Sequence, residues 1–491
     1  MQGTMRCLAA ALLLAAAAPT VAQEGVPALP VEFRGAWVAT VDNIDWPSRP
    51  GLPVAQMRAE LDAILDRAAE LHLNALVFQV RTECDALYQS AIEPWSEWLT
   101  GQQGVAPAEG FDPLAHAVAG AHRRGMELHA WFNPYRARHF KSKSAADPRH
   151  VSVANPAWVV QYGEYKWMDP GVPEALEHTL AVVLDVVRRY DIDGVHIDDY
   201  FYPYPVKGLE FPDGASHEAY RARGGRLTVA EWRRRNVDEM VRRLHQQVHR
   251  EKPWMKFGIS PFGVARPGVP EGTTAGIDQF HQLHADVRRW LREGWCDYIA
   301  PQLYWPIDQK PQSFAVLLPW WAREVGPECH LWTGINPGRA AAREKHWREG
   351  ELATQVLLMR QQPRATGHVH FSFKSLQRDA GGVATLLRSG VYAKRAAIPP
   401  SPWLSEGQPR PPEARIERKA TGLELAWQPS PGARFVTVQA RAGDTWELVA
   451  TCDATDLRAV LPAGLTTGEM AIRVLDRAAV ASEPVVLRVA D

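Results

Sequence analysis

The 491-residue sequence predicts an α/β protein, in which a (β/α)8 TIM barrel is followed by a small all-β sandwich. Two observations carry this prediction. Residues 29–395 alternate between short apolar runs that resemble strands and longer segments with a helical apolar period. A proline-rich linker at residues 396–412 then ends the alternation, and short alternating runs occupy residues 413–491. No glycine-rich phosphate motif follows the first strand, which disfavours a nucleotide-binding doubly wound sheet.

The first 22 residues have the pattern of a cleaved secretory signal. Arg6 supplies the positive charge, residues 8–18 are apolar, and small residues follow at Thr20 and Ala22. The apolar run is shorter than the ~20 residues that a spanning helix needs. We therefore expect a periplasmic or secreted product without a membrane span.

Eight strands are expected in the large domain, and helices between them. Asp112 as N-cap with Pro113 in the first turn opens one helix, which Gly125 closes. Thr228 and Glu231 form a capping box at the start of another. Apolar stripes predict further helices over residues 57–71 and 176–187. The expected strands cover residues 33–40, 75–81, 126–133, 194–199, 256–262, 298–304, 330–335 and 369–373.

The last 80 or so residues repeat short runs of alternating apolar residues at a spacing of ~8–12 residues. Glycines fall between or beside these runs. The pattern and the length are typical of a fibronectin type III-like β-sandwich.

Composition excludes several functions. Lys plus Arg number 55 and Asp plus Glu 56, so the net charge of −1 gives no support to nucleic-acid binding. Five cysteines exclude a disulfide scaffold, and their spacing suggests no metal site. The 19 tryptophans are unusual, and their broad apolar faces suit either sugar rings or an ordinary core.

The most informative cluster follows the fourth expected strand. In a barrel of this type the active site lies at the carboxyl ends of the strands. Side chains alternate along a strand, so His196 and Asp198 share one face while Ile197 lies on the other. Asp198 should therefore enter the barrel mouth, with Asp199 at the rim. Two neighbouring carboxyl groups suit hydrolysis of a glycosidic bond, and the alternative is a helix N-cap or a salt bridge to an arginine such as Arg81 or Arg136.

The sequence leaves open which second carboxyl group acts together with Asp198. Asp199, Asp85, Glu83 and Glu164 are candidates, and Asp85 is the first choice outside the pair because Arg81, four residues earlier, is placed to hold it near the mouth. A loop carboxylate that merely pairs with Arg81 is the alternative. No cofactor and no metal are expected. The expected substrate contacts at the strand ends are Arg81, Trp131, Asn133, Tyr135, His196, Tyr200, Gln302, Tyr304, Trp305 and Asn336.

Several long motifs resemble the glycosyl-hydrolase-like family ten of bacteria. They are FRGAW at residues 33–37, FQVR at 78–81, ELHAWFNPY at 127–135, DGVHIDDYFYP at 193–203 and DYIAPQLYW at 297–305. The resemblance implies a (β/α)8 barrel with a fibronectin-like module, a cell-envelope or secreted location, and hydrolysis of polysaccharide. Peptidoglycan glycan strands are the first substrate it implies. Its functional residues map onto Asp198 and Asp199, with Arg81, Asp85, Asn133, Tyr135, His196, Gln302 and Tyr304 as neighbours.

Two other functions compete with this hypothesis. A metal-dependent hydrolase on the same barrel would use histidines on or beside strands, of which His129, His196, His368 and His370 are the candidates. A non-catalytic glycan-binding protein would keep the cleft without the chemistry, and the absence of an obvious second acid motivates it.

Overall fold

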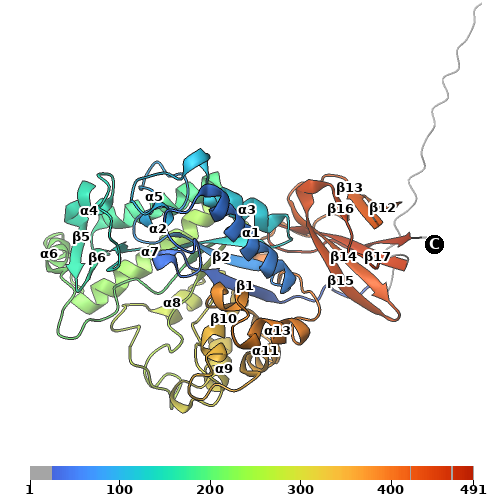
Figure 1. Ribbon diagram of the computed structural model, residues 1–491. Helices are drawn as coiled ribbons and strands as arrows, with labels where there is room; N and C mark the ends of the chain where they lie inside the picture. Colours follow the sequence, from blue (N-terminus) through green and yellow to red (C-terminus); the bar gives the residue numbers. More distant parts are fainter. Residues whose placement is uncertain (1–24, 421, 466–467, 490–491) are drawn as a thin grey trace, which may run out of the picture.

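The computed structural model describes residues 25–420, 422–465 and 468–489, so the expected signal peptide lies outside the described residues. Within them, a closed barrel of eight parallel strands precedes two antiparallel sheets (Figure 1). The predicted fold class is confirmed.

The barrel strands follow one another around the ring in the order β1-β11-β10-β9-β8-β7-β3-β2. Every pair is parallel, so all carboxyl ends meet at one face. The last strand starts four residues before the expected one, because Thr366 and Gly367 carry too little apolar surface to show the pattern. The bounds are β1 Phe33–Val38, β2 Ala75–Arg81, β3 Glu127–Phe132, β7 Gly194–Ile197, β8 Lys256–Ile259, β9 Tyr298–Ile299, β10 His330–Ile335 and β11 Ala365–His370.

Helices cover the outside of the barrel, and two of them begin where the capping signals predict, while α3 ends at His122, three residues before Gly125. The Asp112 carboxylate accepts the backbone N–H of Ala115 at 3.0 Å, and Thr228 with Glu231 forms the capping box. No described helix has the length and apolarity that crossing a bilayer requires. The longer helices are α1 Val54–Glu70, α3 Pro113–His122, α5 Pro173–Arg189, α6 Gly214–Ala222, α7 Val229–Glu251, α9 Phe314–Glu324 and α11 Glu351–Arg360. The shorter ones are α2 Glu97–Thr100, α4 Val151–Ala154, α8 Val287–Arg292, α10 Pro337–Ala341, α12 Phe373–Gln377 and α13 Val383–Ser389.

A small antiparallel sheet is inserted after β3. It consists of β4 Arg136–Arg138, β6 Tyr165–Met168 and β5 Val159–Tyr162, in that spatial order. Because it follows the carboxyl end of β3 directly, this insertion stands beside the barrel mouth.

The C-terminal module is a sandwich of two antiparallel sheets around its own apolar core, which is compatible with a fibronectin type III-like fold. One sheet has the order β12-β13-β16 and the other β15-β14-β17-β18. The strands are β12 Ala414–Lys419, β13 Gly422–Trp427, β14 Ala433–Ala442, β15 Thr445–Asp453, β16 Arg458–Val460, β17 Gly468–Asp476 and β18 Val485–Val489.

The module docks on the amino-terminal end of the barrel, opposite the β4–β6 insertion (Figure 1). Arg434 is almost fully buried there and pairs with Asp191 at 3.0 Å and Asp453 at 3.4 Å. Gly125 has a positive φ of 70°, and a Cβ at this position would stand 2.3 Å from the carbonyl oxygen of Thr451. The close approach of this helix end to β15 therefore requires glycine.

Candidate active site

A cavity of about 200 Å³ lies among the carboxyl ends of the barrel strands. Its walls combine two carboxylates with amide, hydroxyl and aromatic groups, the composition of a carbohydrate site. Strand ends on all sides contribute to it. The lining residues are Trp37, Ala39, Val41, Ile44, Gln79, Trp131, Arg136, Asp198, Asp199, Tyr200, Tyr204, Ser260, Gln302, Tyr304 and Phe371.

Asp198 follows the last residue of β7 and enters the cavity, as the alternation along the strand predicts. The indole N–H of Trp131 on β3 donates to its Oδ2 at 2.9 Å. The amide of Asn133 at 3.3 Å and the backbone N–H of Tyr200 at 3.4 Å add weaker contacts. Burial, together with the nearby charge of Asp199, raises the pKa of Asp198 to about 7.

Asp199 lines the same cavity and is equally buried. The hydroxyl of Tyr204 donates to its Oδ2. Burial raises the pKa of Asp199 to about 6, against the opposing effects of this hydrogen bond and of the amide of Gln302. Both carboxyl groups of the pair are therefore poised to exchange protons near neutral pH.

Arg136 limits how far these pKa values rise. Its guanidinium lies over the ring of Tyr200 at 5.0 Å and donates to the carbonyl oxygen of Thr82 at 2.9 Å. From this fixed position its charge lowers the pKa of both Asp198 and Asp199. The arginine is thus the cation of the site.

His196 is buried behind two residues of the cavity lining, Trp37 and Ser260. The indole N–H of Trp37 donates to its Nε2 at 3.1 Å, while its Nδ1 lies 3.0 Å from the Tyr298 hydroxyl. Burial lowers the pKa of His196 well below its usual value, so the imidazole is neutral and carries its proton on Nδ1. The donors then run in one direction through the barrel core, from Trp37 through His196, Tyr298 and His129 to the carboxylate of Glu127. These hydrogen bonds hold the His196 ring in one orientation.

The expected residues divide into two groups. Those that line the cavity or contact the pair are Asp198, Asp199, Trp131, Asn133, Tyr200, Gln302 and Tyr304. His196 is outside the lining and contacts the lining residues Trp37 and Ser260 from behind. The others lie elsewhere. Tyr135 is fully buried, Trp305 packs edge-on against Phe262 at 5.6 Å, and Asn336 caps α10 by accepting the backbone N–H of Arg339. Glu164 is exposed in the turn between β5 and β6.

The expectation that Arg81 holds Asp85 at the mouth is wrong. Arg81 makes a buried two-pronged pair with Glu93, at 2.6 and 2.8 Å. Asp85 is also buried, and its carboxylate accepts the hydroxyl of Thr82 at 2.6 Å and the backbone N–H of Glu83 at 3.1 Å. The loop after β2 folds back on itself, so it brings Glu93 to the arginine and leaves Asp85 outside the cavity lining.

Several lining residues were absent from the expected set, namely Gln79, Arg136, Tyr204, Ser260 and Phe371. Four of them lie within four residues of a strand end, and Tyr204 lies seven residues after β7. Ser260 follows β8 directly, and Phe371 follows β11 directly. Position near the end of a strand was therefore the signal in the sequence that could have identified most of these lining residues. Hydroxyl and phenyl groups without a neighbouring acid did not stand out in the sequence as candidates.

An aromatic ridge, defined by Tyr200, Trp167, Tyr165 and Phe140, leads from the cavity onto the β4–β6 sheet. Trp167 is buried and contacts Tyr200 at 6.2 Å and Tyr165 at 6.4 Å between ring centroids. Tyr165 in turn contacts Phe140 at 5.3 Å. Among the described residues, Phe140 is the only aromatic side chain in the exposed class, with 44% of its surface accessible. An exposed ring that is linked to the cavity wall through three ring contacts is a surface on which a sugar ring can stack.

The loop that carries Phe140 is anchored to the segments that follow the neighbouring strands β1 and β2. Lys141 forms an ion pair with Asp42, which follows β1. The buried carboxyl of Glu83 accepts the backbone N–H of His139 and the Ser142 hydroxyl. These contacts fix the position of the loop around Phe140.

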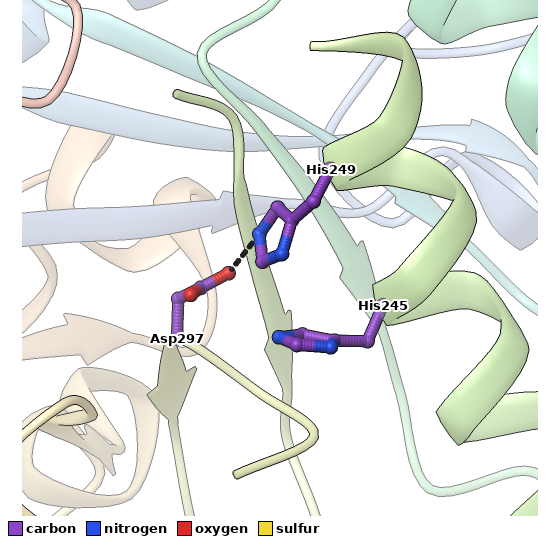
Figure 2. Close-up of side chains that lie close together, drawn as sticks. All are labelled: His245, His249 and Asp297. Carbon is purple, nitrogen blue, oxygen red and sulfur yellow. Dashed lines mark hydrogen bonds and ion pairs between the residues drawn. The ribbon is translucent and has the colours of Figure 1, made fainter. Parts of the chain in front are cut away.

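The histidines proposed for a metal-dependent hydrolase do not meet in the cavity. His368 and His370 both hydrogen-bond the hydroxyl of Tyr392. Among the described residues, one group has ligand atoms close enough for a metal, His245, His249 and Asp297, whose atoms lie within 4.8 Å of one another (Figure 2).

This group lies at the amino-terminal end of β9, remote from the cavity. His249 on α7 contacts Asp297 at 2.9 Å (Figure 2). The same carboxylate accepts the backbone N–H of Phe257 at 2.7 Å and the indole N–H of Trp403 at 3.0 Å. Asp297 thus joins α7, β8 and the segment that leads to the C-terminal module.

Comparison with known proteins agrees with this geometry. The family model described as glycosyl hydrolase-like 10 matches residues 32–348. The glycosyl hydrolase YngK of Bacillus subtilis (strain 168) is 40% identical over 390 residues, which cover 78% of this chain and 76% of that protein. The glycosyl hydrolase DigH of Escherichia coli (strain K12) is 36% identical over 367 residues, covering 69% and 82%.

Solved structures resemble the chain more distantly. The glycoside hydrolase domain of PgaB (BpsB) from Bordetella bronchiseptica has a TM-score of 0.47 at 15% identity, with 73% of this chain and 98% of that chain covered. The catalytic domain of a β-amylase from Paenibacillus polymyxa has a TM-score of 0.48 at 10% identity, with 74% and 99% covered.

Proposed function

The chain belongs to the glycosyl hydrolase-like 10 family and is a glycoside hydrolase, and from this premise we propose that it cleaves a glycan of the bacterial envelope with Asp198 and Asp199 as its acid–base pair. Peptidoglycan glycan strands are the first substrate in this proposal. The observation that carries it is the pair of buried carboxyl groups in an aromatic-walled cavity at the carboxyl ends of the barrel strands.

The chemistry follows from the state of the pair. Hydrolysis of a glycosidic bond needs one carboxyl group that donates a proton to the leaving oxygen and one that is ionised. Burial raises the pKa of Asp198 to about 7 and that of Asp199 to about 6, so the two groups together hold about one proton between these pH values. The pair therefore enters the reaction with one acid and one base.

The remaining features support a polymeric substrate outside the cytoplasm. The aromatic ridge extends the binding surface beyond the cavity, as a chain of sugars requires. The signal pattern in residues 1–22 supports export to the periplasm or beyond. The C-terminal module contributes none of the described residues that line the cavity, which supports a role away from the chemistry.

The test is digestion of purified glycans. The chain without residues 1–22 is incubated with peptidoglycan glycan strands, chitin and a glucan, and the products are identified by mass spectrometry. The proposal expects fragments from peptidoglycan strands and none from the Asp198→Asn protein. Unchanged strands with the wild-type protein contradict the substrate, and binding without turnover favours a glycan-binding protein.

A further inference from the structure

Asp198 and Asp199 are consecutive, and no other acid lines the cavity in the part of the chain that the structure describes. Their Cα atoms stand about 3.8 Å apart at the end of the single strand β7. A retaining enzyme with a protein nucleophile needs carboxyl groups on both sides of the sugar, ~5–5.5 Å apart, and an inverting enzyme needs ~6.5–9.5 Å. The other strand ends present Trp37, Gln79 and Ser260 instead of an acid. The cavity therefore lacks a carboxylate that faces the pair.

Acidic side chains near the barrel mouth already accept hydrogen bonds or form ion pairs. Asp45 accepts the backbone N–H of Ala39 on one oxygen, and the Ser372 hydroxyl with the backbone N–H of Lys374 on the other. Asp42 is paired with Lys141. Neither side chain is free to act as a nucleophile.

We propose that the nucleophile is the 2-acetamido oxygen of the substrate itself, so that the sugar whose C1 is attacked is a 2-acetamido-2-deoxy sugar. This inference rests on the proposed function, because it assigns the substrate class and the mechanism of the same cavity. It also removes the need for a second carboxylate across the sugar.

The two carboxyl groups then have different roles. The strongest contact of Asp198 comes from the indole N–H of Trp131, a group that only donates, so this carboxyl is suited to stay ionised and to accept the acetamido N–H. The partner of Asp199 is the hydroxyl of Tyr204, which both donates and accepts and so tolerates either protonation state. When the acetamido N–H binds Asp198, the ionised form of Asp198 is favoured, and its charge keeps the proton on Asp199.

The steps balance in atoms and protons. The acetamido oxygen forms a bond to C1 while the bond from C1 to the leaving oxygen breaks, and Asp199 gives its proton to that oxygen. A five-membered oxazolinium ring results, with its N–H held by Asp198. Water then attacks C1, Asp199 takes a proton from it, and the C1 bond to the acetamido oxygen breaks. The acetamide and the protonated Asp199 are restored, and the configuration at C1 is retained.

An apolar corner beside the pair fits the acetamido methyl group. Trp37 and Phe371 meet edge to face at 6.1 Å, and Tyr304 stacks on Phe371 at 5.5 Å between centroids. All three rings line the cavity. A methyl group that enters this corner leaves water, which favours N-acetylated over unsubstituted sugars.

The test uses aryl glycosides of a β-1,4-linked N-acetylglucosamine trimer. The sugar next to the aryl group carries an acetyl, fluoroacetyl, difluoroacetyl or trifluoroacetyl group, or a 2-hydroxyl in place of the amide. Because fluorine withdraws electrons from the attacking oxygen, kcat is expected to fall by about a hundredfold or more from acetyl to trifluoroacetyl, and further for the 2-hydroxyl compound. The thiazoline analogue of the trimer is expected to inhibit competitively.

Equal rates across the fluorinated series, or rapid cleavage of the 2-hydroxyl compound, overturn the inference while the protein stays a glycoside hydrolase. Cleavage of a glucan but of no acetamido glycan also overturns it. No cleavage of any glycan contradicts the proposed function itself, which is a different outcome.

The variants Asp198→Asn and Asp199→Asn test the roles assigned to the two carboxyl groups. A trimer fluoride needs no acid for its leaving group, so Asp199→Asn is expected to form the oxazoline from it at near wild-type rate, while Asp198→Asn loses the rate on both substrates. The reverse pattern contradicts the assignment.

Discussion

Replacement of Trp131 by phenylalanine keeps an aromatic ring beside the carboxyl pair and removes one hydrogen-bond donor. The indole N–H that is lost stands 2.9 Å from Asp198 Oδ2. A hydrogen bond to a charged group is worth about 1.5–3 kcal/mol, and 1.36 kcal/mol corresponds to one pKa unit. Because the donor stabilises the ionised form, its loss raises the pKa of Asp198 from about 7 by about one to two units.

The assay is the pH dependence of kcat/KM, which reports ionisations of the free enzyme. The wild-type profile is expected to be bell-shaped, with limbs near the pKa of Asp199 (about 6) and that of Asp198 (about 7). In Trp131→Phe the alkaline limb of the profile moves to higher pH by about one to two pH units, and the acidic limb keeps its position. At the optimum, kcat/KM falls about ten- to hundredfold, because without the indole donor the proton is held more tightly on Asp198, and the ionised form of Asp198 that binds the acetamido N–H costs more free energy to reach.

The control is Trp332→Phe, which removes an indole N–H that donates to the neutral hydroxyl of Thr366 at 3.0 Å. This variant is expected to keep the wild-type limbs. If Trp131→Phe is folded by circular dichroism and its profile superimposes on that of the wild type, the reasoning about Asp198 is refuted.

Further predictions concern the pair, the aromatic ridge, metal ions and the module. Asp198→Asn and Asp199→Asn are each expected to lower kcat on glycan strands by about 10²–10⁴ while the Kd for the strands, measured by calorimetry, is kept; unchanged kcat in either contradicts its role. Phe140→Ala is expected to raise KM several-fold for long strands but not for a short fragment, and Val316→Ala, equally exposed on α9, is the control that changes neither. Dialysis against EDTA is expected to leave kcat/KM unchanged, because the groups around the pair are N–H and O–H donors; a loss that Zn²⁺ restores contradicts this. Arg434→Met leaves the buried carboxylates of Asp193 and Asp453 without this cation and is expected to lower the free energy of unfolding by about 3–5 kcal/mol, measured in urea; an unchanged value contradicts the docking contact.

Much of the fold could be predicted from local patterns. The helix starts at Pro113 and Val229 are set by side chains within three residues, so the capping signals were sufficient. The orientation of Asp198 followed from the two-residue period of a strand. These features depend on neighbours along the chain, which the sequence displays directly.

The partners of charged groups could not be predicted in this way. Arg81 pairs with Glu93 rather than with the nearer Asp85, because the path of the loop after β2 decides which acid arrives. Trp305 lies at a strand end but packs against Phe262 outside the cavity lining. The strand β11 begins four residues before the predicted strand, because its first residues carry little apolar surface. Each of these outcomes depends on contacts between distant segments, which periodicity does not encode.

The central claim is that the carboxyl pair after β7 cleaves an envelope glycan. Its most direct test is the rate at which purified peptidoglycan glycan strands are shortened by the wild-type protein and by the Asp198→Asn, Asp199→Asn double variant, with products resolved by mass spectrometry. The account predicts new reducing ends with the wild type alone. Equal release by the double variant, or intact strands in both reactions while another polysaccharide is cut, contradicts it.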